Sequence, residues 1–436
     1  RQMKNYRSMK QTIHPAGSLG GTITLPPDKS IAQRAALFSL LSSQTSIISN
    51  YPKAEDPQTA LRCVEQLGAM VTESADTVTI QGTGRDGIIN TPGVIDCGNS
   101  GTVMRMLSGI LAGAGVEAVL TGDDSLKARP MKRIIDPLTQ MGATVHSEKG
   151  GIPPLHLSRT GFLKPITFRL PVASAQLKSC VLLGGLFGEE PTKVIETVAT
   201  RNHTEGMLRL PVTRQEGVTI ISSYRGLSIP VQSITIPGDF SAAAFWLVAG
   251  SIGRDSEIFL PAVGINPTRC AALHILQRMG ADIEISNRKM SGMEPTADLR
   301  VRSAPLKPVE IHSDEIPNAI DELPVLSVAM AFANGISRIT GAHELRFKES
   351  DRLAAIQEIL IRAGIHVEVE NDSLTIYGKT DRVIQSAVYD SRHDHRIAMS
   401  AAILSLRADG LSEINHAEAA AVSYPEFWSH LDSLHQ

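Results

Sequence analysis

The sequence predicts an α/β protein of two similar domains, each made of three βαβαββ units in which buried helices are surrounded by sheet. Three observations lead to this prediction. The chain has 436 residues, which is too many for one ordinary core. A similar helix start recurs six times along it. The segments after these starts are apolar on every side, as in Ala35 to Leu41, which is typical of helices inside a core.

The six helix starts define the repeat. Each offers a small or acidic residue that can cap a helix, and successive starts are 70, 74, 67, 80 and 73 residues apart. In each unit a second, amphipathic helix is expected to end at a glycine, as at Gly68, Gly142 and Gly280, before a pair of strands. The starts are Ser30, Ser100, Ser174, Ser241, Asp321 and Asp394.

Two strand-to-helix junctions that look alike predict the domain boundaries. Residues 23–30 and 234–241 both read as a strand, a Pro or Pro-Gly break and a capped helix. We therefore expect the chain to cross twice, giving domain I from residues 1–28 plus 237–436 and domain II from residues 29–236. The N-terminal strand then joins the second half, and the predicted active site lies in the cleft between the domains.

Composition narrows the function classes. The net charge is −3, from 42 Lys and Arg against 45 Asp and Glu, so no overall basic field favours nucleic acid or an anionic membrane. Apolar runs are far shorter than the roughly 20 residues of a membrane span. The basic residues 1–10 precede no apolar segment, so they are interpreted as a disordered or foreign leader rather than a secretory signal. We expect a cytoplasmic monomer.

The cysteines are widely spaced and form no CxxC pair, which argues against a disulfide framework and a zinc cage. Buried, reduced thiols are expected at Cys63, Cys97, Cys180 and Cys270. No metal motif, P-loop, dinucleotide fingerprint or nucleophile elbow is present in the sequence, so we expect neither a metal nor another cofactor.

Several helix starts of the first half carry cations or hydrogen-bonding groups. Lys29 and Ser30 with Arg34 fit either an anion site at a helix N-terminus or a cap with solvated charges. Residues 98–102 allow a ligand to approach the backbone, although a capped turn explains them equally well. Arg105, in an apolar helix, needs a partner, and a structural ion pair is favoured slightly over a ligand. Arg129 could reach the cleft from a mobile loop, and residues 174–176 suit hydroxyl or phosphate groups.

The second half supplies carboxylates as well as cations. Asp321 is either a helix cap or a general base. Residues 348–352 hold four ionisable groups, with Lys348 and Arg352 expected on one helix face, and a solvated helix start is the alternative. His395 and Arg396 open an apolar helix. If these starts face the cleft, they form a pocket for a small, multiply charged anion, with Asp321, Glu349 and His395 as acid–base candidates.

The sequence resembles the 5-enolpyruvylshikimate-3-phosphate synthase family from about Gly17 to the C-terminus. Seven motifs in the family's order make this resemblance specific. They are Pro27-Asp28-Lys29-Ser30 with Arg34, Gly98-Asn99-Ser100-Gly101-Thr102, Ala128-Arg129-Pro130, Ser174-Ala175-Gln176, Asp321-Glu322, Lys348-Glu349-Ser350-Asp351-Arg352 and Asp394-His395-Arg396.

The resemblance implies an inside-out α/β barrel in each domain and transfer of the enolpyruvyl group of phosphoenolpyruvate to shikimate 3-phosphate, with phosphate released from a tetrahedral intermediate. Asp321 would take the proton of the attacking hydroxyl, Glu349 or Lys29 would protonate the methylene carbon, and His395 would support Glu349. The implied shikimate 3-phosphate ligands are Lys29, Ser30, Arg34, Ser174, Ala175, Gln176, Arg201, Asp321 and Lys348. The implied phosphoenolpyruvate ligands are Lys29, Asn99, Gly101, Arg129, Gln176, Arg352 and Arg396.

Two alternatives stay open at this point. The sister family that acts on UDP-N-acetylglucosamine usually has Lys-Asn at the first motif and a loop cysteine near Arg129, whereas this chain has Lys29-Ser30 and no cysteine in residues 121–133. A non-catalytic anion-binding protein of the same fold is the second. Ala175, Glu344 and Val422 depart from many members and resemble the family's second branch, which leaves sensitivity to glyphosate open.

Overall fold

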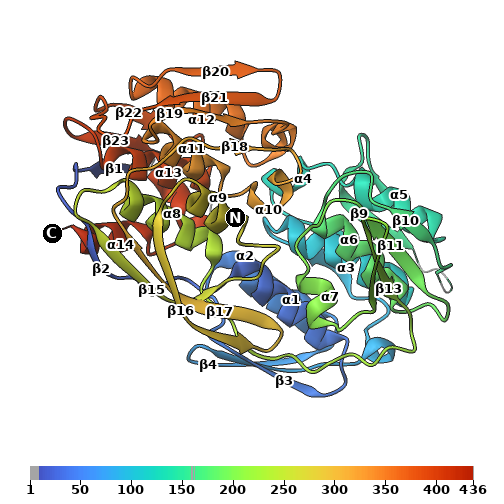
Figure 1. Ribbon diagram of the computed structural model, residues 1–436. Coiled ribbons are helices and arrows are strands. Elements are labelled where there is room, and N and C mark those ends of the chain that lie inside the picture. Colours follow the sequence, from blue (N-terminus) through green and yellow to red (C-terminus); the bar gives the residue numbers. More distant parts are fainter. Residues whose placement is uncertain (1–8, 159–160, 162, 436) are drawn as a thin grey trace. The chain divides into compact units, whose positions relative to one another are not determined.

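The computed structural model describes residues 9–158, 161 and 163–435 (Figure 1). Of the leader expected over residues 1–10, residues 1–8 lie outside the described part, and the expectation is wrong at Lys10, because this residue begins β1 and pairs with Asn415. The chain forms two compact units. Unit 1 comprises Arg1–Pro26, Gly238–Lys289 and Pro295–Gln436, and unit 2 comprises Pro27–Pro237 and Met290–Glu294. Each unit has its own hydrophobic core.

Three buried helices form the centre of unit 2: α1 (Lys29–Leu40), α3 (Gly101–Ala114) and α6 (Ala175–Gly185). Side chains cap their N-termini. Asp28 Oδ1 accepts from the N–H of Ile31 at 2.9 Å, and Ser100 and Ser174 cap α3 and α6 in the same way. The expected start at Ser30 is therefore wrong by two residues, because the carboxylate of Asp28 already satisfies the first turn.

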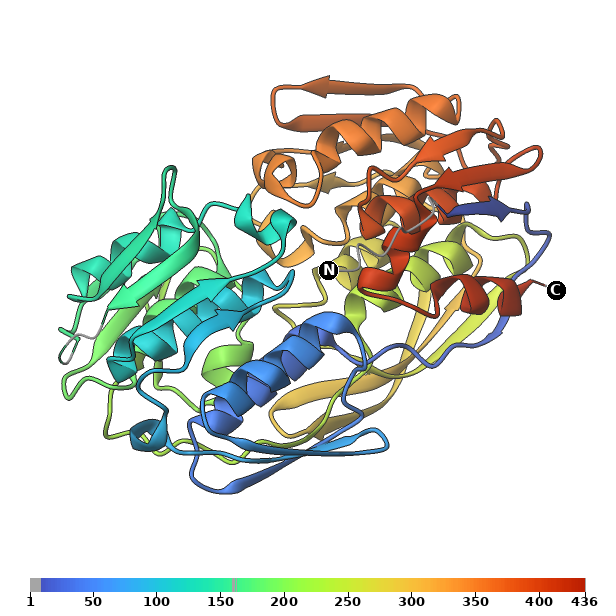
Figure 2. The ribbon, with the colours of Figure 1, turned by 180° about the vertical axis from the view of Figure 1, so that it is seen from behind.

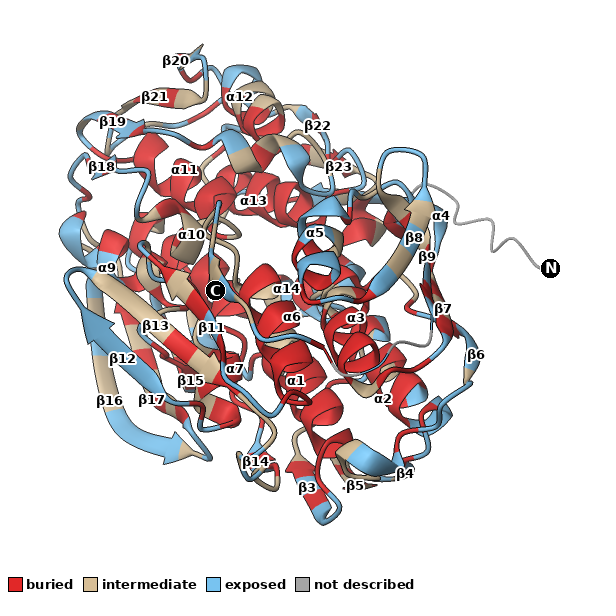
Figure 3. Ribbon diagram, turned by 90° about the vertical axis from the view of Figure 1, so that its right-hand side faces the viewer, coloured by how far each residue is buried: buried red, intermediate tan, exposed pale blue. Residues whose placement is uncertain are grey.

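Unit 1 repeats this arrangement with α8 (Phe240–Ile252), α11 (Leu323–Ala331) and α13 (His395–Ser405). Figure 3 shows the central helices as almost wholly buried. Asp239 caps α8 and Asp394 caps α13, so the expected start at Ser241 is also displaced. The cap interpretation of Asp321 is wrong, because Glu322 occupies the cap position of α11, and its side chain makes no capping bond within the described residues.

Each unit surrounds its helices with three separate sheets rather than one closed barrel. Five sheets have four strands, and in each of these the first two neighbours are parallel while the second and third are antiparallel. In unit 2 the sheets are β14-β3-β5-β4 (Ser233–Thr235, Thr45–Ser49, Thr77–Gln81, Met70–Ser74), β6-β7-β9-β8 (Gly93–Asp96, Ala118–Thr121, Ile152–Ser158, Thr144–Glu148) and β10-β11-β13-β12 (Thr167–Arg169, Thr192–Glu196, Val218–Ser223, Val212–Gln215).

The sheets of unit 1 follow the same order, except that the last has three strands. They are β2-β15-β17-β16 (Gly20–Thr22, Glu257–Gly264, Glu294–Arg302, Asp282–Ser291), β18-β19-β21-β20 (Glu310–Ile311, Gly335–Ile339, Ser373–Gly378, Val367–Glu370) and β22-β23-β1 (Val388–Asp390, Ser412–Asn415, Lys10–Ile13). Figure 2 shows β1, in dark blue, beside the red strands from the end of the chain.

The two junctions that look alike exchange strands. β2 comes from early in the chain and pairs with β15, whereas β14 pairs with β3. Next to the second pair, the side-chain amide of Asn50 donates to the carbonyl of Ile236, 186 residues later in the chain. Next to each junction the backbone is tied: the N–H of Asp28 donates to Pro237 at 2.8 Å, and that of Asp239 donates to Pro26 at 2.8 Å. In the described part of the chain, five of the six units are complete βαβαββ units in space, and two of these take their first strand from elsewhere in the chain. The sixth departs from the expectation, because its sheet has three strands and one of them is β1.

The remaining helices pack outside the central ones. In unit 2 they are α2 (Glu55–Gln66), α4 (Asp124–Lys127), α5 (Lys132–Gln140), α7 (His203–Met207) and the 3₁₀ turn η1 (Arg85–Gly87). In unit 1 they are α9 (Ala271–Arg278), α10 (Ile316–Ala319), α12 (Arg352–Arg362), α14 (Phe427–Leu434) and the 3₁₀ turns η2 (His343–Phe347) and η3 (Ala417–Val422). None of the described helices has the length and apolar character that crossing a membrane requires.

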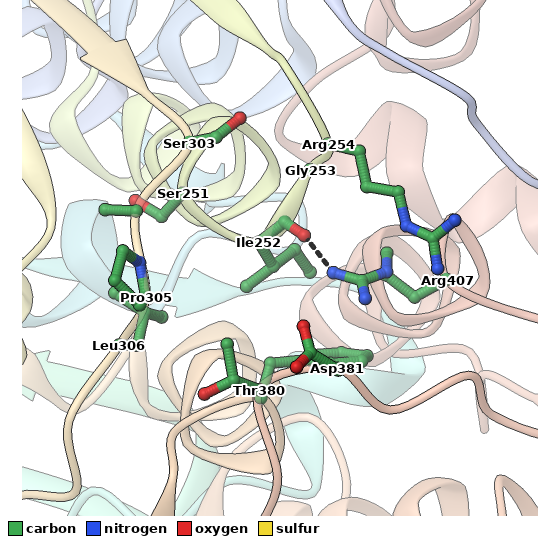
Figure 4. A pocket seen from close by; sticks show the side chains of 12 residues that line it. Ser251, Ile252, Gly253, Arg254, Ser303, Pro305, Leu306, Thr380, Asp381 and Arg407 are labelled. Carbon is green, nitrogen blue, oxygen red and sulfur yellow. Dashed lines mark hydrogen bonds between the residues drawn. The ribbon is translucent and has the colours of Figure 1, made fainter.

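Arginines donate to backbone carbonyls at the C-terminal ends of the central helices α8 and α6. In unit 1 the guanidinium of Arg407 donates to the carbonyl of Ile252, the last residue of α8, and lies 5.1 Å from the ring centre of Phe332 (Figure 4). In unit 2 Arg85 donates to the carbonyl of Leu186, just past α6, at 2.8 Å. Positive charge at a helix C-terminus complements its dipole. All four cysteines are buried and free, which confirms that expectation.

Candidate active site

Arg352 is the centre of a charged cluster in unit 1. Only 1% of its side chain is exposed, and its Nε donates to Asp394 Oδ2 at 2.8 Å. One Nη donates to Glu349 Oε2 at 2.6 Å, and the other lies 3.3 Å from Asp321 Oδ1. Burying a guanidinium is costly without partners, and here three carboxylates from three different segments supply them.

The elements explain why these groups meet. Asp321 precedes α11, Arg352 begins α12 and Asp394 caps α13, so the starts of adjacent helices bring them together. Asp351 caps α12 by accepting from the N–H of Ala354 at 3.0 Å. The expectation that Lys348 shares a helix face with Arg352 is wrong, because Lys348 has an extended backbone before the helix starts.

Asp321 is the carboxylate of this cluster that lies near both Arg352 and Lys348. Its Oδ1 lies 3.8 Å from Lys348 Nζ, and 21% of its side chain is exposed. Glu349, 32% exposed, is also open to solvent, whereas Asp394 is fully buried. The cluster therefore offers two carboxylates to a ligand and keeps the third for structure: Asp394 also accepts from Ser350 at 2.9 Å.

The charges act strongly on one another. Burial alone would raise the pKa of Glu349, but Arg352, His395 and Lys348 outweigh it and hold that pKa far below its usual range. Burial would lower the pKa of Arg352, which Glu349, Asp394 and Asp321 raise above its usual value. Burial, assisted by Arg396, lowers the pKa of His395 to about 3, so this imidazole is neutral near pH 7.

Arg396 is the cation of this cluster that is best placed to accept an anion. It is 7% exposed and lies in the first turn of α13, where the backbone N–H groups and the helix dipole favour negative charge. Its Nε is buried and finds no hydrogen-bond partner among the residues that the structure describes. A buried guanidinium in this state is completed by a carboxylate or phosphate ligand.

In unit 2 the start of α1 carries a second group of cations. Lys29 Nζ lies 3.0 Å from Asp56 Oδ2, and Ser30 occupies the next, partly exposed position. Arg34, one turn on, is 3% exposed and donates to Thr204 Oγ1 at 3.2 Å. Burial and then the charge of Arg201 lower the pKa of Arg34 to about 10, which places two guanidinium groups close enough to repel. An anion between them would relieve that repulsion.

The start of α3 forms a third group. A methyl group added at Gly101 would lie 2.7 Å from an Nη of Arg105 and 3.5 Å from an Nη of Arg129, so this glycine keeps space beside two guanidinium groups. Arg129 donates to Asn99 Oδ1 at 2.9 Å. Burial, then Arg129, lowers the pKa of Arg105 to about 10.

Gln176, in the first turn of α6, belongs to the same group. It accepts from Arg105 at 2.6 Å and donates to Thr102 Oγ1 at 2.8 Å. The expectation that Arg105 forms a structural ion pair is wrong, because in the described part of the chain its guanidinium donates instead to the neutral amide of Gln176. Ala175 is the first residue of α6 and Ser174 its cap, accepting from Leu177 at 3.3 Å.

Some members of these groups were not expected from the sequence. Asp56 and Thr204 hold Lys29 and Arg34, and Lys178 is fully buried between Glu196, at 3.1 Å, and Glu205, at 2.6 Å. The one sequence signal was Lys178 itself, a charge in an apolar helix. Its partners lie 18 and 27 residues away, beyond the reach of local patterns.

Comparison with known proteins identifies the class first. The fold matches the solved structure of an enolpyruvyl transferase from Streptomyces tendae with a TM-score of 0.72 at 18% identity, covering 98% of this chain and 97% of that one. It matches EPSP synthase from Acinetobacter baumannii with a TM-score of 0.87 at 37% identity, covering 98% of both chains. The fold is that of the enolpyruvyl transferases, as the resemblance implied.

The sequence comparisons then identify the family. The sequence model of the EPSP synthase (3-phosphoshikimate 1-carboxyvinyltransferase) family matches residues 13–431. The 3-phosphoshikimate 1-carboxyvinyltransferase of Salinibacter ruber is 47% identical over 428 residues, which are 98% of this chain and 99% of that protein. That of Legionella pneumophila is 43% identical, covering 97% of each. The chain belongs to the EPSP synthase family.

Proposed function

We propose that the chain transfers the enolpyruvyl group of phosphoenolpyruvate to the 5-hydroxyl of shikimate 3-phosphate and releases phosphate. The observation that carries this function is the family match along nearly the whole chain. The buried carboxylate–arginine cluster around Arg352 supports it, because the reaction needs a base, an acid and cations in one place. The chain is accordingly a transferase.

The cations are assigned to the anionic substrates as the resemblance implied. Arg34 and Arg201, whose mutual repulsion an anion would relieve, bind shikimate 3-phosphate. Arg129, Arg352 and Arg396 bind phosphoenolpyruvate, and Gly101 keeps the space that its small carboxylate and phosphate groups need. The other members of the two sets are Lys29, Ser30, Ser174, Ala175, Gln176, Asp321 and Lys348 for shikimate 3-phosphate, with Lys29, Asn99 and Gln176 also for phosphoenolpyruvate.

Asp321 is proposed as the general base. Its carboxylate is partly exposed and fixed by Arg352 and Lys348, so it can accept the proton of the attacking hydroxyl without first moving. The carbon–oxygen bond forms at C2 of phosphoenolpyruvate as its methylene carbon gains a proton. Elimination of phosphate and loss of a proton from the new methyl group then restore the double bond. These reaction steps involve no net oxidation or reduction, so they require no redox cofactor.

Glu349 is proposed as the proton donor, with Lys29 as the alternative. In the unliganded chain the pKa of Glu349 is held low, mainly by Arg352 among the surrounding charges, which favours the ionised form. An anionic substrate next to Arg352 would compensate that positive charge and raise the pKa of Glu349, which favours the protonated form that a proton donor needs. The neutral ring of His395 would then assist Glu349 without competing as a base.

The test is phosphate release from phosphoenolpyruvate with two acceptors. We expect release with shikimate 3-phosphate and none with UDP-N-acetylglucosamine. Release only with the sugar nucleotide would move the chain to the sister activity, and release with neither would favour a non-catalytic anion-binding protein. The proposed monomeric state is tested by light scattering after size exclusion, and the proposed cytoplasmic location by fractionation of cells.

A further inference from the structure

Two histidines and a glutamate meet at one edge of the β22-β23-β1 sheet, apart from the groups assigned to catalysis. His416 follows β23 directly, His393 lies three residues after β22, and Glu418 is in η3. One donor atom from each residue, a ring nitrogen or a carboxylate oxygen, lies within 4.8 Å of the others. The Nδ1 atoms of His416 and His393 are 3.7 and 4.0 Å from Glu418 Oε1.

The topology explains why these residues meet. β22 and β23 are parallel neighbours, with Asp390 paired to Asn415, so the segments that leave them start from the same edge. Ser391 joins the two segments by donating to the carbonyl of His416 at 3.0 Å. Both histidines have left-handed backbones, with φ of 57° at His393 and 55° at His416. Such backbones are uncommon outside glycine and concentrate at positions with a special role.

Neighbouring groups orient the donors. Glu418 Oε2 accepts from the backbone N–H of Met9 at 2.9 Å, which leaves Oε1 toward the two imidazoles. On the other side of the His416 ring, Nε2 lies 4.0 Å from Asp390 Oδ1, so Nδ1 faces Glu418. At 4.0 Å the carboxylate of Asp390 is beyond hydrogen-bond reach of the ring. In metal sites a carboxylate in contact with the far side of a histidine fixes the ring and raises its basicity, which Asp390 is near enough to do once an ion is bound.

We propose that His393, His416 and Glu418 bind a divalent transition-metal ion, best fitted by Zn²⁺. Two imidazoles and one carboxylate form a known three-residue zinc set, which a water completes to a tetrahedron. With bonds of about 2.0–2.2 Å, the donors of such a site lie roughly 3.4 Å apart. The observed separations are somewhat longer. Binding would therefore require the His393 side chain, which is 71% exposed, to turn toward the ion.

The position of the site gives the metal a structural consequence. His393 is followed immediately by Asp394, whose carboxylate holds Arg352 and caps α13. A bound ion would tie the segment from residue 391 to residue 394 to the end of β23. This inference rests on the geometry of unit 1 alone and is independent of the reaction proposed above.

The test is titration of the tag-free full chain with ZnCl₂ in a calorimeter, in buffer without chelators. We expect one ion per chain at saturation. His393→Asn and His416→Asn remove a ligand while keeping a residue that tolerates a left-handed backbone. Each should weaken binding by at least about 10-fold, the lower end of the loss seen when a supporting contact is removed. Co²⁺ in place of Zn²⁺ should give the visible absorption of a tetrahedral site, which both variants lose.

His366→Asn is the matched control, because His366 is exposed and lies 3.1 Å from Glu368, but among the described residues it belongs to no group with a second metal-binding histidine. It should bind Zn²⁺ as the parent does. Circular dichroism of each variant tests whether the fold is kept. Absence of stoichiometric binding, or equal affinity in the parent and His393→Asn, would overturn the proposal.

Discussion

Asp321 shows how one residue changes meaning between sequence and structure. Locally it reads as a helix cap, but Glu322 takes that position and Asp321 instead faces Arg352 and Lys348. We expect Asp321→Ala to lower kcat by about 100-fold or more, the usual scale for loss of a general base, with little change in the Kd of shikimate 3-phosphate. Steady-state kinetics and equilibrium binding measure the two effects.

The control for this substitution is Asp314→Ala, which removes an exposed carboxylate from the segment before α10, the short helix that precedes α11. It should leave kcat unchanged. If Asp321→Ala keeps the parent's kcat, Asp321 takes no part in proton transfer.

Glu349 makes stability depend on pH. Because its pKa is lower in the folded chain than in the unfolded one, the folded state is favoured above the unfolded pKa of about 4.3, and this contribution is lost as pH falls toward the folded pKa. Glu349→Gln lacks it. The difference in unfolding free energy between parent and variant should therefore be constant from pH 7 to about 5 and shrink below about 4.3. Urea denaturation at a series of pH values measures it, and a difference that grew on acidification would contradict the assignment.

Local sequence patterns identified the cations at the starts of the central helices but not the residues that bind them. Lys29, Arg34, Arg352 and Arg396 could be singled out because charges at the start of an apolar helix need a reason. Asp56 and Thr204, which hold the first two, belong to ordinary polar segments, and only the folded chain shows the contact. The assignment of these residues to substrates rests on the family resemblance and stays a prediction.

At the scale of elements, the six apolar helices could be predicted, and so could the caps Ser100, Ser174 and Asp394, but the other three starts could not. A carboxylate two residues upstream displaced the start of α1 and of α8, because serine and aspartate are both good caps and the sequence does not rank them. The strand exchange of β2 and β14 could be predicted in part from the sequence, since the two junctions look alike. The three-stranded sheet with β1 could not, because its antiparallel partner lies at the other end of the chain.

The helix C-termini give a prediction at this scale. Arg407→Met should lower the free energy of unfolding by about 1–3 kcal/mol, because the carbonyl of Ile252 loses its donor in a half-buried position and the contact with Phe332 changes. Arg254→Met is the control: it lines the same pocket in Figure 4 but is exposed. Urea denaturation should show the loss only for Arg407→Met, and equal stability of both variants would argue against the helix-end role.

For the whole molecule, the two units differ in continuity. Unit 2 is almost one unbroken stretch with its own core, whereas unit 1 needs β1 and β2 from the start of the chain. We expect residues 27–237 expressed alone to fold and to melt cooperatively by circular dichroism. Residues 238–436 alone should not fold, because this fragment lacks Leu19 and Ile23, and the core side chains that pack against them would be exposed to solvent.

A rearranged chain provides the control. Residues 238–436 joined through a flexible linker to residues 9–26 restore β1 and β2 and should recover a cooperative melt. If residues 238–436 melt cooperatively without them, the N-terminal strands are dispensable for unit 1.

The pairing of β1 with β23 also determines when β1 can complete its sheet during biosynthesis. Lys10 and its partner Glu413 are 403 positions apart, so at about 5–20 residues per second the ribosome delivers the partner strand roughly 20 to 80 s after the first strand has emerged. Unit 2 is complete long before that and can fold while the nascent N-terminal strands remain unpaired. The residues of β1 thus reach their native partners only after residues 412–415 have been made, and until then this strand presents unpaired backbone groups that chaperones and proteases can bind.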